Sequence, residues 1–351
     1  MILSRRLLIP VAAAFIIAVF CTAGASVRII GLSPSISRGG SAVVIFEAPE
    51  PDTAPMAGPN ILVNDEKVII PSTFIKKDFF IALIPWRITD KRFKAEILIH
   101  DNSGLTETNA IPFVIKKAYY RENKIHMDGD FDLDKKFTEL GIEKPAHKLS
   151  SIEQYDSIIA YFEKKRVLNT EEAATSNSAP LVSDFFLNVF SPLNNWRMTS
   201  PFGEHRSFIL NKKTVRESYH YGIDMVSSTN GGIFASNGGK AVFTGYNGAE
   251  GNMVLIDHSL GLYTLYCHMS EIYVKKDAEI ISGEIIGVTG DTGYALGEHL
   301  HFSVIIQGVF VSPAEWMNAG WVNSNILDVV RKSAAMVNSA AGIKADYSSA
   351  K

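Results

Sequence analysis

Gly297-Glu298-His299-Leu300-His301-Phe302-Ser303-Val304 places two histidines, two residues apart, at the start of a run of β-forming residues. Side chains on a β-strand alternate between its two faces, so His299 and His301 are expected on the same face. Two imidazoles on one rigid strand can bind a metal ion together, or one can bind it while the other transfers protons. A lone His-x-His pair also occurs on surface strands that bind nothing. The rest of the sequence is therefore needed to distinguish a functional site from an ordinary surface strand.

A second candidate pair lies upstream, where His220 and Asp224 are four residues apart. This spacing puts both side chains on one face of a helix, and also on one face of a strand. With an imidazole from another segment they would supply the three protein ligands that a catalytic zinc ion needs. A third candidate, His268, ends a β-type run, where a histidine is often purely structural. Six of the nine histidines lie between residues 205 and 301: His205, His220, His258, His268, His299 and His301. The other three are predicted to be surface residues: His100, His126 and His147.

Six short motifs follow one another between Met198 and Trp316. They are Thr199-Ser200-Pro201-Phe202-Gly203, His220-Tyr221-Gly222-Ile223-Asp224, Gly251-Asn252-Met253-Val254-Leu255-Ile256-Asp257-His258, Tyr266-Cys267-His268-Met269-Ser270, Ile286-Gly287-Val288-Thr289-Gly290-Asp291-Thr292-Gly293 and His299-Leu300-His301-Phe302. In order and spacing this series resembles the lysostaphin/LytM-type zinc metallopeptidases, which cleave peptides in bacterial cell-wall peptidoglycan. The resemblance implies a compact antiparallel β domain with its site in a groove.

The roles of the family's site residues can be assigned to the matching positions of this sequence. The resemblance implies that His220, Asp224 and His301 bind one Zn²⁺ ion, and that His268 and His299 are catalytic without binding the metal. Zinc lowers the pKa of bound water toward about 7 and polarises the scissile carbonyl. A histidine with a pKa near neutrality can take a proton from the water and return one to the leaving amine.

Several other positions in or near these motifs are not assigned a role as zinc ligand or catalytic residue. Cys267 stands where relatives commonly have alanine, and it is expected to be a small buried side chain rather than a ligand or a redox switch. Asp277-Ala278 replaces a turn glycine of the family, away from the site. His258 is interpreted as a turn residue, and Glu298 is expected to point away from its neighbour His299 on the strand. His205-Arg206 could border the groove.

The N-terminus predicts export from the cytoplasm. Arg5 and Arg6 precede an apolar run over residues 7–20, and Ala23-Gly24-Ala25 offers a cleavage site. Residues 1–25 are therefore predicted to be a signal peptide, which places the protein in the periplasm or cell envelope. An uncleaved N-terminal membrane anchor is the alternative. Cys21 also suggests a lipoprotein signal, but the residue directly before it, Phe20, is not the small residue expected upstream of a lipidated cysteine.

The mature chain is predicted to be mainly β. Residues 26–117 contain short apolar runs separated by turn signals and predict a small β-sandwich-like N-terminal module. Residues 118–180 predict a helical connector and linker, with a helix over about 152–165. Residues 181–320 are assigned to the antiparallel zinc metallopeptidase domain. Residues 321–351 are assigned to a C-terminal helical tail with weak amphipathic character over 325–341.

The composition is that of a globular protein, with 46% hydrophobic and 20% charged residues. A net charge of −3 argues against a nucleic-acid partner. The leading prediction is a zinc endopeptidase that hydrolyses peptidoglycan stem or cross-link peptides with a metal-activated water. The alternatives are a non-enzymatic, cell-wall-binding regulator of another hydrolase, or a secreted peptidase acting on proteins. A regulatory protein partner fits either class, and the sequence indicates no oligomeric state.

Overall fold

The computed structural model describes residues 27–48, 59–100, 106–126, 156–157, 160, 164, 169–170, 188–227, 230–295 and 297–340. The predicted signal peptide lies outside the described residues, and so does most of the helix predicted over 152–165. The described chain is mainly antiparallel β, which confirms the predicted fold class. None of the described helices combines the length and the apolar character needed to cross a membrane.

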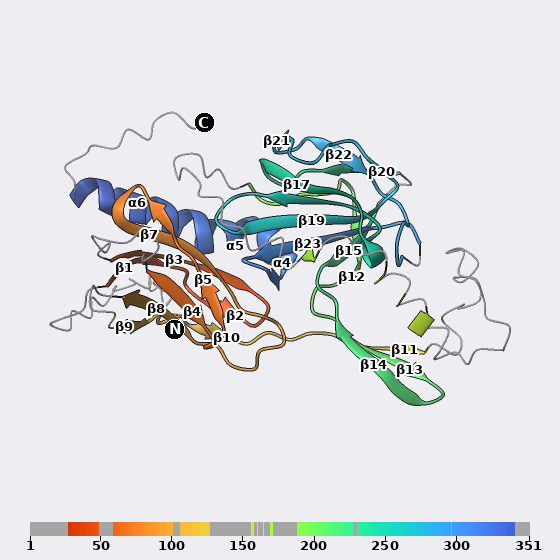
Figure 1. Cartoon of the computed structure of the whole chain (residues 1–351), viewed down its shortest axis with the longest axis horizontal. Coiled ribbons are helices and arrows are strands. Elements are labelled where there is room, and N and C mark those ends of the chain that lie inside the picture. Colours follow the sequence, from red (N-terminus) through yellow and green to blue (C-terminus); the bar gives the residue numbers. More distant parts are fainter. Residues whose placement is uncertain are drawn as a thin grey trace, which may run out of the picture.

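The N-terminal part is a β-sandwich of two four-stranded sheets (Figure 1). The first sheet has the order β1 (Arg28–Leu32), β3 (Ser41–Glu47), β7 (Lys76–Pro85), β6 (Ser72–Phe74). The second has the order β5 (Lys67–Ile69), β4 (Asn60–Val63), β8 (Ala95–His100), β9 (Thr106–Ala110). Two short strands, β2 (Ile36–Ser37) and β10 (Ile115–Lys116), pair in parallel beside them. The predicted sandwich is therefore present.

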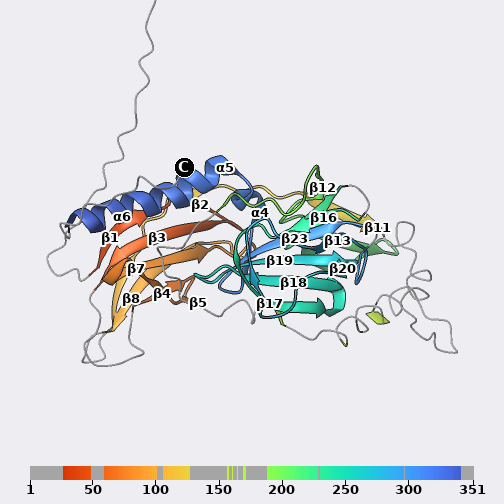
Figure 2. The same ribbon diagram turned by 90° about the horizontal axis from the view of Figure 1, so that it is seen from above.

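Strand β3 is buried on both of its faces, so the N-terminal sheet must be covered on the side opposite the second sheet as well. Its first six residues are all buried, so both faces of the strand are covered. Val44 and Phe46 pack into the core between the two sheets, whereas Val43 and Ile45 face the opposite side. The C-terminal helix α6 (Asp328–Ala340) lies along that opposite side, over β1 and β3 (Figure 2). The predicted C-terminal helix thus exists, and it is packed on the N-terminal sheet.

The second half of the chain is built on an eight-stranded sheet and a smaller three-stranded sheet. The large sheet has the order β12 (Arg197–Ser200), β15 (Ile223–Val226), β23 (Leu300–Ile306), β19 (Leu262–Met269), β18 (Asn252–Asp257), β17 (Gly239–Tyr246), β21 (Glu279–Ile280), with β24 (Val309–Val311) paired to β23. The small sheet has the order β16 (Gly232–Phe234), β22 (Ile285–Val288), β20 (Glu271–Ile272). A 3₁₀ turn, η2 (Gly248–Glu250), joins β17 to β18.

A third group of strands projects from this sheet (Figure 1). Strands β13 (His205–Leu210) and β14 (Lys213–Tyr219) form a hairpin, and β11 (Glu122–His126) pairs in parallel with β13. The sequence assigned β11 to the connector and did not predict this strand. Its side chains are largely exposed, so its apolar alternation is weak, and its hydrogen-bond partner lies about eighty residues away along the chain.

The two halves share one hydrophobic core. Apolar residues of β3 and β7 belong to the same cluster as Phe302 of β23 and Trp316 of α4 (Pro313–Trp316). Short helical turns α5 (Ala319–Val322) and η3 (Asn323–Leu327) then lead to α6. At this junction the Glu315 carboxylate accepts hydrogen bonds from the Ser41 backbone N–H at 2.9 Å and the Ser41 hydroxyl at 3.3 Å. Burial of Glu315 raises its pKa to about 7, although hydrogen bonds from Ser41 and Ser37 oppose the shift.

Glu315→Gln should remove a pH-dependent loss of stability. The folded-state pKa of about 7 exceeds the ordinary value of 4.5, so the folded state binds more protons between these values and stability falls as pH rises through them. The ionised carboxylate should cost up to about 3 kcal/mol above pH 7. Thermal unfolding between pH 5 and pH 8 should show that the stability of the variant increases relative to that of wild type as pH rises. Exposed Glu271→Gln is the control; a Glu315→Gln advantage that is the same at pH 5 and pH 8 would contradict this account.

Candidate metal centre

The strand register brings two of the predicted ligands together. Strands β15 and β23 pair antiparallel with Asp224 directly opposite His301. Directly opposed residues of an antiparallel pair have Cβ atoms about 4.5–5.5 Å apart, so these side chains meet on one face. His220 lies just before β15 and is held by backbone hydrogen bonds, donating its N–H to the Glu204 carbonyl at 2.9 Å and accepting from Gly203 N–H at 2.8 Å.

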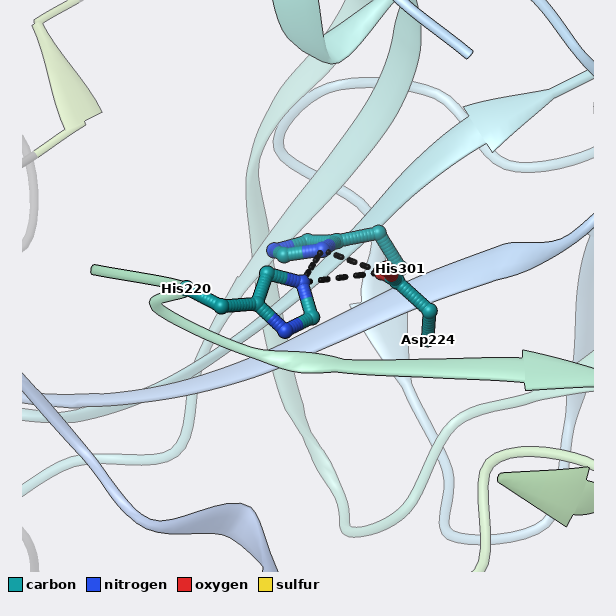
Figure 3. Close-up of side chains that lie close together, drawn as sticks. All are labelled: His220, Asp224 and His301. Atoms are coloured by element: carbon teal, nitrogen blue, oxygen red, sulfur yellow. Dashed lines mark hydrogen bonds and ion pairs between the residues drawn. The ribbon is translucent and has the colours of Figure 1, made fainter. Parts of the chain in front are cut away.

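The three side chains converge on a small triangle of ligand atoms (Figure 3). His220 Nε2 lies 3.0 Å from Asp224 Oδ1, and His301 Nδ1 lies 2.9 Å from the same oxygen. The two ring nitrogens are 3.1 Å apart. Tetrahedral zinc with ligands at about 2.0–2.1 Å holds neighbouring ligand atoms about 3.3 Å apart, so the triangle is close to the size that zinc requires.

The hydrogen bonds behind the triangle engage the outer nitrogens of the two ligand rings. His220 Nδ1 lies 2.9 Å from the Pro201 carbonyl oxygen, which can only accept, so in the neutral ring Nδ1 carries the proton and Nε2 presents its lone pair. His301 Nε2 lies 3.0 Å from the Ser303 hydroxyl, which leaves Nδ1 facing Asp224. With both outer nitrogens protonated, two imidazole lone pairs and a carboxylate oxygen converge, and this donor set fits a divalent cation.

The Asp224 carboxylate stays ionised in this setting. Burial raises the pKa of Asp224. When His220 and His301 carry a proton on the nitrogen that faces Asp224, their hydrogen bonds and positive charge outweigh burial and hold the pKa well below its usual range. The site therefore offers a permanent negative charge to a cation over the whole neutral pH range.

His299 and His268 lie beside the triangle. His299 Nε2 is 3.7 Å from Asp224 Oδ1, and the His268 and His299 rings are 4.7 Å apart between centroids. Each ring donates from Nδ1 to a backbone carbonyl, His299 to Gly297 and His268 to Thr292, both at 2.8 Å. In this tautomer Nε2 of each ring carries a lone pair, and Nε2 of His299 faces the triangle.

The backbone at His268 is in an unusual conformation. Its φ angle is +61°, in the left-handed region that costs a non-glycine residue free energy. An irregularity in the β18–β19 pairing lies at the same place, and such bulges re-aim side chains beside active sites. The His268 ring is turned toward His299, while the preceding Cys267 packs in an apolar cluster. Burial, and then the neighbouring rings of His299 and His301, lower the pKa of His268 to about 3, so it is neutral at pH 7.

With this geometry in view, residues 218–313 match Peptidase family M23. All five predicted site residues, four histidines and Asp224, fall inside the matched segment. This segment is an M23 peptidase domain. The sequence-based resemblance is thereby confirmed at the level of the family, which is one of metallopeptidases.

Characterised relatives match the same part of the chain. DD-carboxypeptidase/endopeptidase Mpg of Neisseria meningitidis serogroup B is 37% identical over 122 residues, which are 35% of this chain and 27% of Mpg. Peptidoglycan DD-endopeptidase ShyA of Vibrio cholerae is 35% identical over 115 residues, 33% of this chain and 26% of ShyA. The chain thus spans about a quarter of the length of these relatives.

Among solved structures, the chain is similar to a protein from Pseudomonas aeruginosa described as a peptidase M23. The TM-score is 0.47 at 22% identity, covering 82% of this chain and 95% of that one. The catalytic domain of the antimicrobial peptidase lysostaphin from Staphylococcus simulans gives a TM-score of 0.31 at 27% identity, covering 36% of this chain and 98% of that domain.

Other residues singled out in the sequence lie outside the triangle. Cys267 is fully buried, and burial raises the pKa of its thiol, so it is an inert core side chain. His258 follows β18 and bonds to the Gly238 carbonyl and the Thr264 hydroxyl inside the M23 domain. Glu298 accepts from Thr289, away from the site, as expected. Asp277 has a φ of +68°, in the left-handed region that favours glycine. This conformation explains why a turn glycine is expected at the position.

Arg206 reaches the site, whereas its neighbour His205 does not. His205 bonds to Glu122 of β11 and packs against the Tyr219 ring in a tilted arrangement, away from the triangle. The Arg206 guanidinium lies 3.4 Å from Asp224 Oδ2. Its partner Glu204 is buried and was not among the site residues predicted from the sequence. In the sequence, Glu204 is a single acidic residue between Gly203 and the basic pair His205-Arg206. This pattern is too common to indicate a functional residue.

Gly222 is the glycine that the site requires most directly. A Cβ at this position would lie 2.5 Å from His301 Nε2 and 2.6 Å from the Phe302 carbonyl oxygen. The backbone oxygen cannot move without disturbing the β15–β23 ladder. The glycine within the His220 to Asp224 motif therefore makes room for the third ligand of the triangle.

Gly222→Ala should displace His301 and weaken metal binding. The added methyl group overlaps the ring and a backbone carbonyl, so we expect zinc affinity to fall by tenfold or more, in the range seen when groups supporting a metal ligand are removed. Zinc content after dialysis and competition with a chromogenic chelator would measure it. Gly232→Ala is the control, since a Cβ there meets nothing closer than 3.8 Å. A Gly222→Ala protein with wild-type zinc affinity would refute this role.

Proposed function

We propose that this protein is a zinc-dependent endopeptidase that hydrolyses peptide bonds in the stem or cross-link peptides of peptidoglycan. The observation that carries the proposal is the convergence of His220, Asp224 and His301 on one small triangle, with His299 Nε2 3.7 Å from its carboxylate corner. A metal-ligand set and an unprotonated imidazole beside it are the parts that metal-assisted hydrolysis needs.

The triangle would hold the zinc ion through His220 Nε2, Asp224 Oδ1 and His301 Nδ1. When bound, zinc supplies a Lewis acid that activates water near neutral pH and polarises the substrate carbonyl. The chain's own part is orientation. The Pro201 carbonyl holds a proton on the outer nitrogen of His220, and the Ser303 hydroxyl hydrogen-bonds the outer nitrogen of His301. These contacts orient both rings with their inner nitrogens toward the ion.

His299 and His268 would divide the remaining work. In hydrolysis the water oxygen bonds to the carbonyl carbon, the C–N bond breaks and a proton passes to the leaving amine. His299 would take that proton at Nε2 and return it to the amine, since its Nδ1 is committed to the Gly297 carbonyl. His268 remains neutral at pH 7 and would orient the water or substrate by accepting a hydrogen bond at Nε2.

The substrate class is supported by the relatives. Mpg is named a DD-carboxypeptidase/endopeptidase and ShyA a peptidoglycan DD-endopeptidase, and both match the segment that contains the triangle. The proposed location is the periplasm or cell envelope, reached through the predicted signal peptide over residues 1–25. In the proposed domain organisation, residues 26–117 form the N-terminal module and residues 181–320 the peptidase domain.

Substitution of each site histidine should separate binding from catalysis. His220→Ala and His301→Ala remove a ligand, so both zinc and peptide release from purified sacculi should be lost. His299→Ala should retain zinc and lower kcat by about 10²–10⁴, the range for removal of a general acid–base group. Metal analysis and chromatography of released muropeptides would measure both quantities. Exposed His126→Ala on β11 is the matched control and should behave as wild type.

The same experiment tests the alternatives. Full activity in His301→Ala, or wild-type protein that neither retains nor needs zinc, would refute the proposed mechanism. Zinc-loaded wild type that cleaves casein but not sacculi would favour a secreted peptidase acting on proteins. Protein that binds sacculi, releases nothing and stimulates a second hydrolase would favour the regulator.

A further inference from the structure

The two oxygens of the Asp224 carboxylate have different surroundings. Oδ1 faces His220 and His301, at 3.0 and 2.9 Å. Oδ2 faces the guanidinium of Arg206, whose Nη2 lies 3.4 Å away. A carboxylate can rotate and offer either oxygen, or both, to a cation. A cationic group fixed on one side therefore decides which oxygen is presented on the other.

Arg206 is itself held at two further points. Its Nε donates to Glu204 Oε1 at 3.0 Å, and its Nη2 donates to the Ser200 hydroxyl at 2.7 Å. The Ser200 hydroxyl also lies 3.3 Å from His220 Nδ1, on the outer side of that ligand ring. Because the guanidinium is planar and its donors are fixed relative to one another, it cannot satisfy these partners in another orientation. One side chain thus contacts Asp224 directly and reaches His220 through Ser200.

Glu204 is anchored from a distant part of the chain. Its side chain is only 2% exposed, so its charge needs partners inside the protein. Asn123 of β11 donates to Oε1 at 3.1 Å, and Arg121 Nε lies 2.8 Å from Oε2 as an ion pair without hydrogen-bond alignment. Strand β11 reaches this position because it pairs in parallel with β13, which carries Arg206. The chain upstream of the M23 segment therefore contributes to the surroundings of the ligand set.

We propose that Arg206 is a positioning residue that turns Oδ1 of Asp224, and not Oδ2, toward the metal, and that Glu204, anchored by β11, sets the orientation of Arg206. This inference rests on the proposed zinc function. Electrostatic attraction is not its basis, because a guanidinium near the ligands repels a divalent cation. A net gain in metal affinity must come from holding the carboxylate in one orientation.

The decisive measurement is the zinc dissociation constant of purified full-length variants, obtained by competition with a chromogenic chelator. Arg206→Gln should weaken zinc binding about 10–100-fold, the range for loss of groups that orient metal ligands. Arg206→Lys keeps the charge but lacks the planar fork, so it should bind zinc nearly as weakly as Arg206→Gln. Arg216→Gln, on exposed β14 of the same hairpin, is the matched control and should retain wild-type affinity.

Two further variants protect the test against misfolding. Arg206→Gln alone leaves the buried Glu204 with fewer partners, so the double variant Glu204→Gln/Arg206→Gln replaces the charged pair by a neutral one. It should show the same loss of zinc affinity with a cooperative thermal transition in the metal-free state. Asn123→Ala acts only through Glu204 and should weaken zinc binding by a smaller factor, with KM for a muropeptide unchanged.

The outcomes separate this inference from the proposed function. If wild type binds zinc and cleaves sacculi while folded Arg206 variants keep its zinc affinity, the positioning role is overturned and the proposed function stands. Tighter zinc binding in Arg206→Gln would show that repulsion dominates and would overturn the role as well. Wild-type affinity in Arg206→Lys would assign the effect to charge rather than orientation. A wild type that binds no zinc would overturn both proposals.

Discussion

The register between β15 and β23 is the constraint on which the rest of the site depends. It places Asp224 opposite His301, and a slip of one residue would turn one of these side chains to the other face of the sheet. The neighbouring pairs Ile223–Phe302 and Met225–Leu300 prevent such a slip, because their side chains are buried in the main core on the opposite face. The same alternation that buries the apolar residues therefore directs the polar ones outward together.

That core extends beyond the M23 segment and connects the site to the N-terminal sheet and to the last described helix. Phe302 contacts Phe190, which stacks on Trp316, and the Trp316 indole donates to the Ser41 hydroxyl at the start of β3. Helix α6 covers the free face of the N-terminal sheet, so apolar surface that the sandwich alone would expose is buried by the last described helix. The peptidase sheet and the N-terminal sheet are consequently supported by one continuous set of contacts.

Much of the site could be predicted from the sequence, for identifiable reasons. Strand alternation indicated that His301 shares a face with His299, and an even spacing put His220 and Asp224 on a common side. The resemblance to a family then assigned roles to these residues, and the structure brings them together. Their roles as ligands and catalysts stay predictions. Glu204 and β11 were not identified, since nothing local distinguishes a buried acid or a strand whose partner lies far along the chain.

The sequence by itself determined the mainly β fold class, the family and a candidate set of cation-binding residues, because these follow from local periodicity and from the resemblance carried by its motifs. Only the tertiary structure decided that α6 packs on the N-terminal sheet, that β11 joins β13, and that Arg206 faces the second oxygen of Asp224. Contacts of this kind depend on register and packing between segments separated by tens to hundreds of residues. Local patterns carry no information about which distant surface will cover them.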